Sequence, residues 1–273
     1  MKKLFFSLVI MLATTLFVSG QKKILLVGDS WAETIWRSRA FDQVLQEYGY
    51  PAGLTEGGEG NSKEGNLTAI GGSRADRWGT NYLGWQERIK EHLEKNPSIT
   101  FIHLIIGGND LLNIIAKENI SHWTVAQRDE QWNIIRENIR KLLTFCLDIR
   151  PEIQVVIADY DYLNIANADK AYQFTFGGMT QQQVNQYFVE VGLKKMELAG
   201  ENDRVHYLQH WGVLNNHYAN ALPVARYLEG GATADLVERM PKAADVGDGV
   251  HPHPEAHKIL LRKAMEMFYK DQL

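Results

Sequence analysis

The amino-acid sequence predicts an α/β protein in which helices cover both faces of a central parallel sheet. Short apolar runs lack polar alternation, as expected of strands that are buried on both faces. Between these runs, apolar residues recur at helical spacing, so that strands and helices alternate along the chain. The chain has 273 residues, of which 45% are hydrophobic and 23% are charged, which is enough for a sizeable core and too apolar for a disordered protein.

The first half of the chain begins with an apolar run at residues 24–27, which we expect to be a strand. A helical pattern of apolar residues follows it as far as Tyr48, and Gly49 is placed to end that helix. Residues 51–69 are rich in Gly and Glu and predict a surface loop, with a short strand near residues 67–70.

The second half of the chain continues the alternation. Residues 101–106, 153–158 and 205–208 are predicted as further buried strands. A helix with an apolar stripe that includes Cys146 is expected to end near Pro151. Two features close the chain: an aromatic-containing segment without a clear period at residues 211–247, expected to be a long loop or helical excursion, and a last helix that starts near Pro254.

The N-terminus has the pattern of a secretory signal peptide. Lys2 and Lys3 precede an apolar run over residues 4–17, and small residues follow at 18–20. A transmembrane anchor is the alternative, but the run is shorter than the roughly 20 residues that a span needs. We therefore expect a signal peptide at residues 1–20 and a single domain at residues 21–273, exported to a periplasm or secreted, with no membrane span after cleavage.

Charge and cysteine content exclude several classes of protein. The 29 basic and 33 acidic residues give a net charge of −4 without a basic stripe, which argues against a nucleic-acid partner. Cys146 is the single cysteine, so the chain has no internal disulfide. Its place in an apolar helical stripe predicts a buried core residue rather than a reactive thiol.

The first predicted strand is followed at once by Gly28, Asp29 and Ser30. A serine at this point could act as a nucleophile, since its backbone N–H lies near the positive end of a helix and can hold an oxyanion. Alternatively, Ser30 and Glu33 match a helix capping box, in which the hydroxyl only satisfies a backbone amide.

Three further short motifs carry possible chemistry. Asn109 lies in a Gly-Gly-Asn-Asp turn after the second long strand, where its amide N–H can point at developing negative charge or simply serve the turn. Gly71 and Gly72 form a possible turn with a free backbone donor. Asp248 and His251 are spaced so that the carboxylate can reach the ring, as a general base requires, although a solvent-facing histidine in a loop has the same pattern.

Together these blocks resemble the SGNH hydrolases, also called the GDSL esterase/lipase family. The resemblance spans nearly the whole chain after residue 20 and implies a flavodoxin-like three-layer α/β/α sandwich and ester hydrolysis without a metal or cofactor. It implies that Ser30 is the nucleophile, His251 the general base and Asp248 its orienting carboxylate. The Ser30 amide, the Gly72 amide and the Asn109 side chain would form the oxyanion hole, with Asp29 in a structural role.

The chain departs from the family pattern at two places. Trp31 stands where the motif that names the family has Leu, which puts a bulky aromatic beside the nucleophile and leaves the pocket shape open. In the glycine block, Gly72 is preferred as the oxyanion donor, with Gly71 as the alternative. A G-x-S-x-G elbow is absent from the sequence, which argues against the α/β-hydrolases.

The predicted substrate is a carbohydrate or other small O-acyl ester. Segment 211–247 mixes polar and charged residues and lacks the strongly apolar character of a lipase lid. Aromatic residues in loop-like segments could stack on sugar rings. These are Trp78, Trp85, Trp211, Tyr218 and Tyr227.

Other functions remain open at this point. A lipase, lysophospholipase or thioesterase would use the same triad, and a non-catalytic glycan-binding module could keep the scaffold. His251, His253 and His257 cluster around Glu255, but the H-E-x-x-H pattern of zinc proteases is absent, so no metal is expected.

Overall fold

The structure is a computed structural model that describes residues 21–214 and 246–273. Its centre is a five-stranded, all-parallel sheet with the strand order β2-β1-β3-β4-β5. Ile24 pairs with Thr55 on one side and with Phe101 on the other. The strands are β1 (Ile24–Gly28), β2 (Thr55–Glu56), β3 (Phe101–Ile105), β4 (Gln154–Ala158) and β5 (Val205–Leu208).

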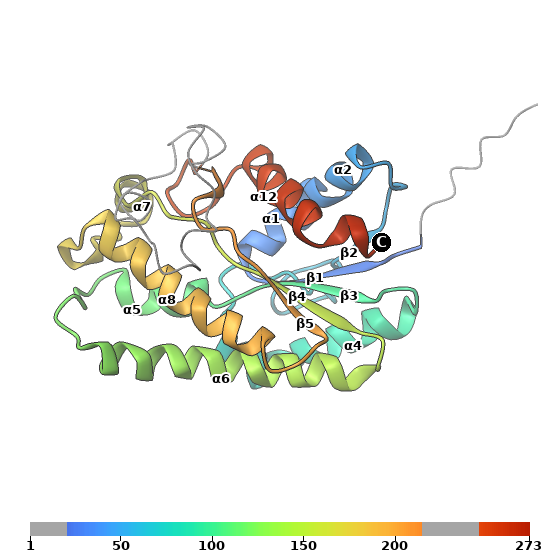
Figure 1. Ribbon diagram of the computed structural model, residues 1–273, viewed down its shortest axis with the longest axis horizontal. Helices are drawn as coiled ribbons and strands as arrows, with labels where there is room; N and C mark the ends of the chain where they lie inside the picture. Colours follow the sequence, from blue (N-terminus) through green and yellow to red (C-terminus); the bar gives the residue numbers. More distant parts are fainter. Residues whose placement is uncertain (1–20, 215–245) are drawn as a thin grey trace, which may run out of the picture.

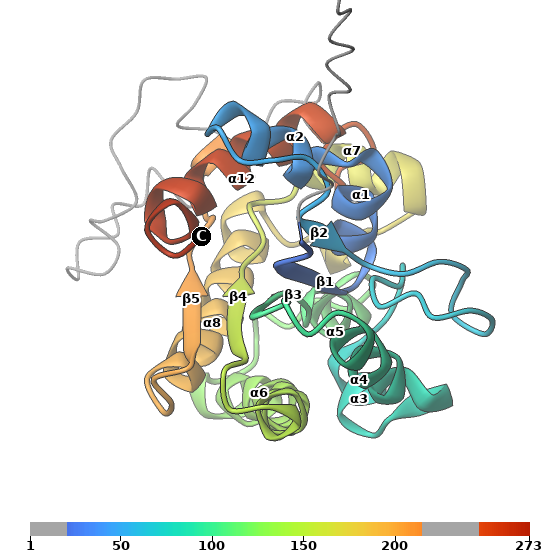
Figure 2. The same ribbon diagram turned by 90° about the vertical axis from the view of Figure 1, so that its right-hand side faces the viewer.

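Helices cover both faces of this sheet (Figure 2). On one face lie α1 (Ser30–Ser38), α2 (Ala40–Glu47) and α12 (Pro254–Met267). The opposite face is covered mainly by α4 (Trp85–Lys95), α6 (Val125–Ile149) and α8 (Gln181–Ala199). Shorter helices complete the described residues: α3 (Ala75–Gly79), α5 (Gly108–Ile115), α7 (Ile165–Tyr172) and the 3-10 turns Tyr82–Gly84, Phe176–Gly178 and Tyr269–Asp271.

The predicted three-layer α/β/α sandwich is therefore confirmed. The strand order is that of flavodoxin-like folds, in which the direction of winding reverses between β1 and β3. Ligands of such sheets bind beyond the carboxyl ends of the strands at this reversal. The segments that follow β1 and β3 begin α1 and α5, at the left of Figure 1.

Two predicted elements differ from the structure. The single helix expected up to Tyr48 is two helices, because Arg39 adopts a left-handed conformation (φ 56°) at which α1 ends and α2 begins. The short strand expected at residues 67–70 is reduced to one bridge between Ala69 and Gly28, and the ladder partner of β1 at this edge is β2 instead. The 19-residue helix α8 was not predicted.

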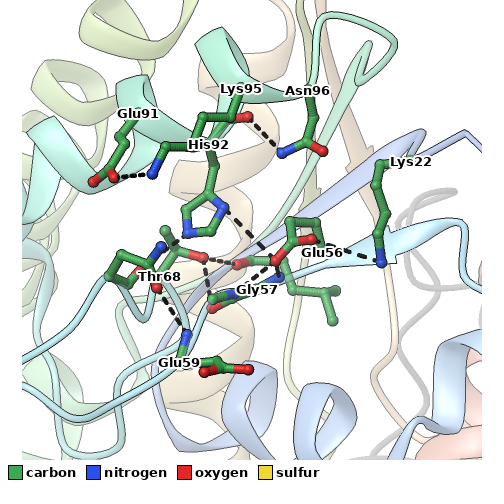
Figure 3. A network of polar contacts seen from close by, with 12 residues as sticks. Lys22, Glu56, Gly57, Glu59, Thr68, Glu91, His92, Lys95 and Asn96 are labelled. Carbon is green, nitrogen blue, oxygen red and sulfur yellow. Dashed lines mark hydrogen bonds and ion pairs between the residues drawn. The ribbon is translucent and has the colours of Figure 1, made fainter.

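The segment predicted as a surface loop is held by buried polar contacts (Figure 3). The Glu56 carboxylate accepts the backbone N–H of Gly57 and Gly58 at 3.1 and 3.0 Å. The buried His92 ring on α4 lies 2.9 Å from the Asn66 carbonyl oxygen. Because these contacts fix the chain on both sides of its outward excursion, the turn at residues 70–73 returns to a defined place beside β1.

Cys146 lies in the core on α6, with 1% of its surface exposed. Burial raises the pKa of its thiol to about 12, which keeps it protonated and unreactive. The prediction of a structural cysteine is confirmed. None of the described helices is long and apolar enough to cross a membrane, and the predicted signal peptide at residues 1–20 lies outside the described residues.

Candidate active site

The turn after β1 presents Ser30 at the start of α1. Gly28 has φ +138°, and a Cβ atom there would lie 1.9 Å from the carbonyl oxygen of Ile105, so that only glycine fits. Asp29 is the N-cap of the helix, and its Oδ1 accepts the N–H of Trp31 at 3.0 Å. The alternative in which the Ser30 hydroxyl caps the helix is therefore wrong, and the hydroxyl is available for other partners.

Ser30, His251 and Asp248 form one hydrogen-bonded chain. The Ser30 Oγ lies 2.7 Å from Nε2 of His251, and Nδ1 of the same ring lies 2.7 Å from Oδ2 of Asp248. The second carboxylate oxygen of Asp248 accepts the N–H groups of Val250 and His251 at 2.8 and 2.7 Å. Because the side chains of His251 and Asp248 are 29% and 32% exposed, the arrangement is open to a substrate.

The Asp248 carboxyl is held in its ionised form. Burial raises its pKa, but hydrogen bonds from the Tyr172 hydroxyl and from the backbone and ring of His251 outweigh this, and the pKa falls from 3.8 to about 2. A carboxylate at neutral pH can fix the tautomer of the ring and stabilise an imidazolium. The three side chains thus have the geometry and charge that general-base activation of a serine requires.

Tyr172 is a site residue that the sequence did not reveal. Its hydroxyl donates to Oδ2 of Asp248 at 2.6 Å and lies 3.2 Å from Nδ1 of His251. Burial and the neighbouring Asp248 raise the pKa of Tyr172 to about 12, so the hydroxyl remains a donor. Tyr172 ends α7 and lies 76 positions before Asp248 in the sequence, within no motif, so that no local pattern could identify it.

The predicted oxyanion donors Gly72 and Asn109 line the same cleft as Ser30. Asn109 is the second residue of α5, the helix that follows β3, and its Nδ2 donates to the Ser73 carbonyl at 3.0 Å. The Gly71 N–H is engaged by the carboxylate of Glu33 at 2.6 Å. Gly72, at φ +71°, lines the same cleft as Ser30, Asn109 and His251, and within the described residues its N–H has no hydrogen-bond acceptor. This favours Gly72 over Gly71 as the donor.

Asp110 joins the two turns that carry these donors. Its carboxylate accepts the N–H of Ala75 at 2.7 Å, which ties the start of α3 to the start of α5. The two adjacent residues of the motif therefore have different contacts: Asn109 lines the cleft, and Asp110 holds the backbone at Ala75.

Asp29 belongs to a buried polar network below the site. Its Oδ2 accepts a short hydrogen bond from the Tyr160 hydroxyl. Burial raises the pKa of Asp29 to about 6, although the bonds from Tyr160 and from the Trp31 N–H oppose that rise. The Lys195 ammonium lies 4.5 Å from the centroid of the Tyr160 ring and 2.7 Å from Oδ1 of Asp159. Asp29 also lies 3.5 Å from Nδ2 of Asn109, so it contacts both the interior and a residue of the cleft, and its structural role stays a prediction.

Trp31 does not fill the cleft. Its ring is 3% exposed and packs edge-on against Tyr160 and His257. The indole N–H donates to the Val250 carbonyl at 3.0 Å. Since Val250 precedes His251, the aromatic residue beside the nucleophile helps to hold the loop that carries the general-base candidate.

The predicted aromatic platform is wrong where it can be checked. Trp78, Trp85 and Trp211 are all buried, each with at most 1% of its surface exposed, and therefore cannot stack on a sugar. Tyr218 and Tyr227 lie outside the described residues, as does most of the predicted segment 211–247.

The histidine cluster considered as a metal site is dispersed in the structure. His257 is fully buried against Trp31, while His251 faces Ser30 and His253 is exposed. Among the described residues, no three His, Cys, Asp or Glu side chains are grouped so that they could hold a metal ion.

Comparison with known proteins adds a family to this geometry. The family described as GDSL-like Lipase/Acylhydrolase matches residues 24–264. No curated protein matches the sequence significantly.

Solved structures share the fold at low sequence identity. A carbohydrate esterase of family 3 from Talaromyces cellulolyticus is 13% identical with a TM-score of 0.52, over 91% of this chain and 97% of that one. An acetyl xylan esterase from Geobacillus stearothermophilus is 13% identical with a TM-score of 0.51, over 92% and 95%. A lipase from a goat rumen metagenome is 11% identical with a TM-score of 0.50, over 91% and 98%.

Proposed function

This chain belongs to the GDSL-like lipase/acylhydrolase family and is an ester-hydrolysing enzyme; on that premise we propose that it removes a short acyl group from a carbohydrate or other small O-acyl ester through Ser30, His251 and Asp248. The observation that carries the proposal is the hydrogen-bonded chain from Ser30 Oγ through His251 to Asp248, with 2.7 Å at each link. A serine without such a base is a poor nucleophile at neutral pH.

The reaction proceeds through an acyl-enzyme. His251 Nε2 takes the proton of the Ser30 hydroxyl as Oγ attacks the ester carbonyl, and the resulting imidazolium is stabilised by Asp248. The tetrahedral intermediate collapses as His251 returns the proton to the departing alkoxide. Water then attacks the acyl-serine with His251 again as base, and the acid and free Ser30 are released.

Three donors act on the negative charge that develops on the carbonyl oxygen. They are the backbone N–H of Ser30, the backbone N–H of Gly72 and the Nδ2 of Asn109, which all belong to the cleft. Donors that are already fixed before the reaction stabilise the intermediate more than they stabilise the substrate. The Ser73 carbonyl, 3.0 Å from Nδ2, fixes the orientation of Asn109.

The size of the space beside Ser30 favours a short acyl group. A recess of about 10 Å³ adjoins Ser30 and Asn109 and is walled by apolar side chains such as Trp31, Leu163 and Phe188. A space of roughly this size holds about one water molecule, and therefore the methyl of an acetyl group rather than a fatty-acyl chain. An acetyl ester is the substrate that we expect.

The alcohol half of the substrate faces more room. A cleft of about 560 Å³ opens from Ser30 toward Lys117 and Phe174 and exposes polar as well as apolar groups. A sugar ring fits such a lining better than a lipid chain. The fold likeness to carbohydrate and acetyl xylan esterases is compatible with this assignment, and the likeness to a lipase sets the alternative. The signal-peptide pattern at residues 1–20 supports export. An exported enzyme would encounter acetylated glycans.

Hydrolysis of p-nitrophenyl esters from acetyl to palmitoyl tests the proposal. We expect the acetyl ester to be cleaved fastest and Ser30→Ala to lower kcat by about 10⁴-fold or more. Ser121→Ala, which removes an exposed hydroxyl from a loop, is the matched control. A serine-reactive organophosphonate should label Ser30 in the wild type.

The other outcomes point elsewhere. A long-chain optimum would keep the triad and indicate a lipase or lysophospholipase, and preference for a thioester would indicate a thioesterase. Absence of Ser30-dependent turnover and of labelling would overturn the proposal in favour of a non-catalytic glycan-binding module.

A further inference from the structure

The cleft beside Ser30 carries an unbalanced positive charge. Its charged lining residues are Arg74, Arg77 and Lys117, and no acidic side chain of the described chain lines it. The chain as a whole is acidic, with a net charge of −4. A cationic lining therefore does not follow from the composition of the protein.

Arg77 is distinguished from the other arginines by its lack of partners. Arg74 is paired with Asp76, with contacts of 3.0 and 2.6 Å. Every other arginine in residues 21–214 and 246–273 also has a carboxylate or carbonyl partner, whereas the Arg77 guanidinium has no hydrogen bond or ion pair there. The Arg77 guanidinium lies 5.2 Å from the centroid of the Tyr82 ring. Stacking on an aromatic face positions a guanidinium but leaves its N–H donors unused.

Lys117 adds a second uncompensated charge to the same cleft. It lies just beyond α5, is exposed, and has no ion pair with any described residue. The hollow on the other side of Ser30 differs, because its charged residues Glu33 and Arg37 neutralise each other at 2.6 Å. In the part of the chain that the structure describes, unpaired positive charge therefore lines the cleft on one side of Ser30 and not the hollow on the other.

From these observations we propose that the ester hydrolysed at Ser30 carries an anionic group on its alcohol half, as an O-acetylated acidic sugar does, and that Arg77 recognises this group. The inference rests on the proposed function. The recess of about 10 Å³ beside Ser30 is too small for a charged acyl chain, and the one charged side chain in its lining is the acidic Asp29. The anion is therefore assigned to the half of the substrate that lies in the larger cleft. A guanidinium binds the two oxygens of a carboxylate or phosphate with its parallel N–H groups, and Lys117 adds a point charge.

The test compares acetylated sugars that share a ring and differ in charge. The substrates are the acetylated methyl glucoside, the acetylated methyl glucuronide and acetylated glucose 6-phosphate. We expect the ratio of kcat/KM for an anionic sugar to that for the neutral sugar to be about 10 to 100 at low salt, the size of one charge-assisted hydrogen bond. The preference should be expressed mainly in KM and should shrink as NaCl is added. The larger of the two anionic ratios identifies a carboxylate or a phosphate.

Variants assign the preference to Arg77. Arg77→Gln should reduce the ratio about tenfold or more, and Arg77→Lys should keep part of it, because the charge stays while the planar fork is lost. Lys141→Gln removes one positive charge from an exposed position on α6 and is the matched control for net charge. A ratio near one in the wild type, or a ratio that Arg77→Gln leaves unchanged, would overturn the inference.

This failure is distinguishable from failure of the proposed function. If the proposed function is wrong, no ester is cleaved in a Ser30-dependent manner, p-nitrophenyl acetate included. If only the inference is wrong, Ser30-dependent cleavage occurs without regard to the charge of the sugar.

Discussion

Two carboxylates in this protein each contact a basic side chain at the same short distance, in very different surroundings. Asp248 meets His251 at 2.7 Å, and Asp159 meets Lys195 at 2.7 Å. The side chains of the first pair are 29% and 32% exposed, whereas those of the second are 1% and 2% exposed. The accessible pair is adjacent to a serine, and the sealed pair is enclosed between β4 and α8.

The difference in exposure decides which groups the two carboxylates and their partners can contact. Asp159 accepts hydrogen bonds from Lys195, Tyr207 and the buried Trp211. Both oxygens of its carboxylate are therefore bound by side chains of the protein interior. At the exposed pair, one ring nitrogen of His251 is bound by the carboxylate and the other faces Ser30. A buried pair that loses one partner leaves an uncompensated charge, while an exposed one is resolvated. We therefore expect the accessible pair to govern activity and the sealed pair to govern stability.

Removal of the general base should give the largest effect. We expect His251→Gln to lower kcat by about 10⁴-fold or more, since neither proton transfer can occur. The free energy of unfolding should change by less than about 1 kcal/mol, because the ring is partly exposed. Esterase assays and urea unfolding measure the two quantities. His253→Gln, an exposed neighbour in the same loop, should retain activity, and equal losses in both variants would contradict the assignment.

Removal of Lys195 should give the opposite result. We expect Lys195→Met to lower the free energy of unfolding by about 3–5 kcal/mol, because it leaves the buried Asp159 carboxylate without its cation. In a chain of this size, that corresponds to a fall in Tm of roughly 10 °C. The control is Lys194→Met on the same helix, whose partners Asp129 and Glu197 are about half exposed. If calorimetry gave equal falls for the two variants, burial would not explain the difference between the pairs.

Asn109→Ala separates transition-state stabilisation from binding. Loss of one oxyanion donor typically costs about 10²- to 10³-fold in kcat, with little change in KM. Steady-state kinetics on p-nitrophenyl acetate distinguishes the two constants. A rise in KM with an unchanged kcat would mean that Asn109 binds the substrate and does not act on the oxyanion.

Tyr172→Phe should give the smallest effect. The variant keeps the ring and removes the donor to Asp248, so we expect a fall in kcat of about three- to tenfold. Without this hydrogen bond, the pKa of Asp248 rises from about 2 toward its ordinary value of 3.8. A lowered pKa stabilises the fold above the unfolded value, and this gain is lost as the pH falls through the folded value. The stability advantage of the wild type over the variant should therefore be present at neutral pH and shrink as the pH falls from about 3.8 to about 2.

The acid side of the pH profile of kcat/KM measures the change in the pKa of Asp248. In the wild type, Asp248 keeps its charge until the pH approaches about 2. Protonation of Asp248 should therefore add no second step to the fall in kcat/KM above that pH. Tyr50→Phe, whose hydroxyl contacts the Lys270 carbonyl, is the control. An identical profile in Tyr172→Phe and in the wild type would show that the hydroxyl has no part in orienting Asp248.

The sequence by itself determined the fold class and most of the strands. Short uninterrupted apolar runs that alternate with helical patterns are typical of a parallel sheet covered on both faces. The order of the four blocks indicated the family, which the match over residues 24–264 confirms. Local signals determined β1, β3, β4 and β5: the first two are buried throughout, β4 is buried in all but its first residue, and β5 is buried at both of its end residues.

Only the tertiary structure decided which groups meet. The replacement of the expected 67–70 strand by β2 and the burial of Trp78 depend on contacts between segments far apart in the chain. The same is true of Tyr172 beside Asp248.

The tertiary structure also decided whether the Ser30 hydroxyl caps the helix or is free to face a histidine. A serine at the start of a helix can cap it or attack a substrate, and the sequence is identical in both cases. Asp29 takes the cap, and a histidine 221 positions away takes the hydroxyl. Composition and periodicity record which surfaces a segment buries, whereas the approach of two polar atoms from distant segments is fixed by how the layers pack. For this reason the sequence could name the candidates for the site, and the fold alone could bring them within hydrogen-bonding distance.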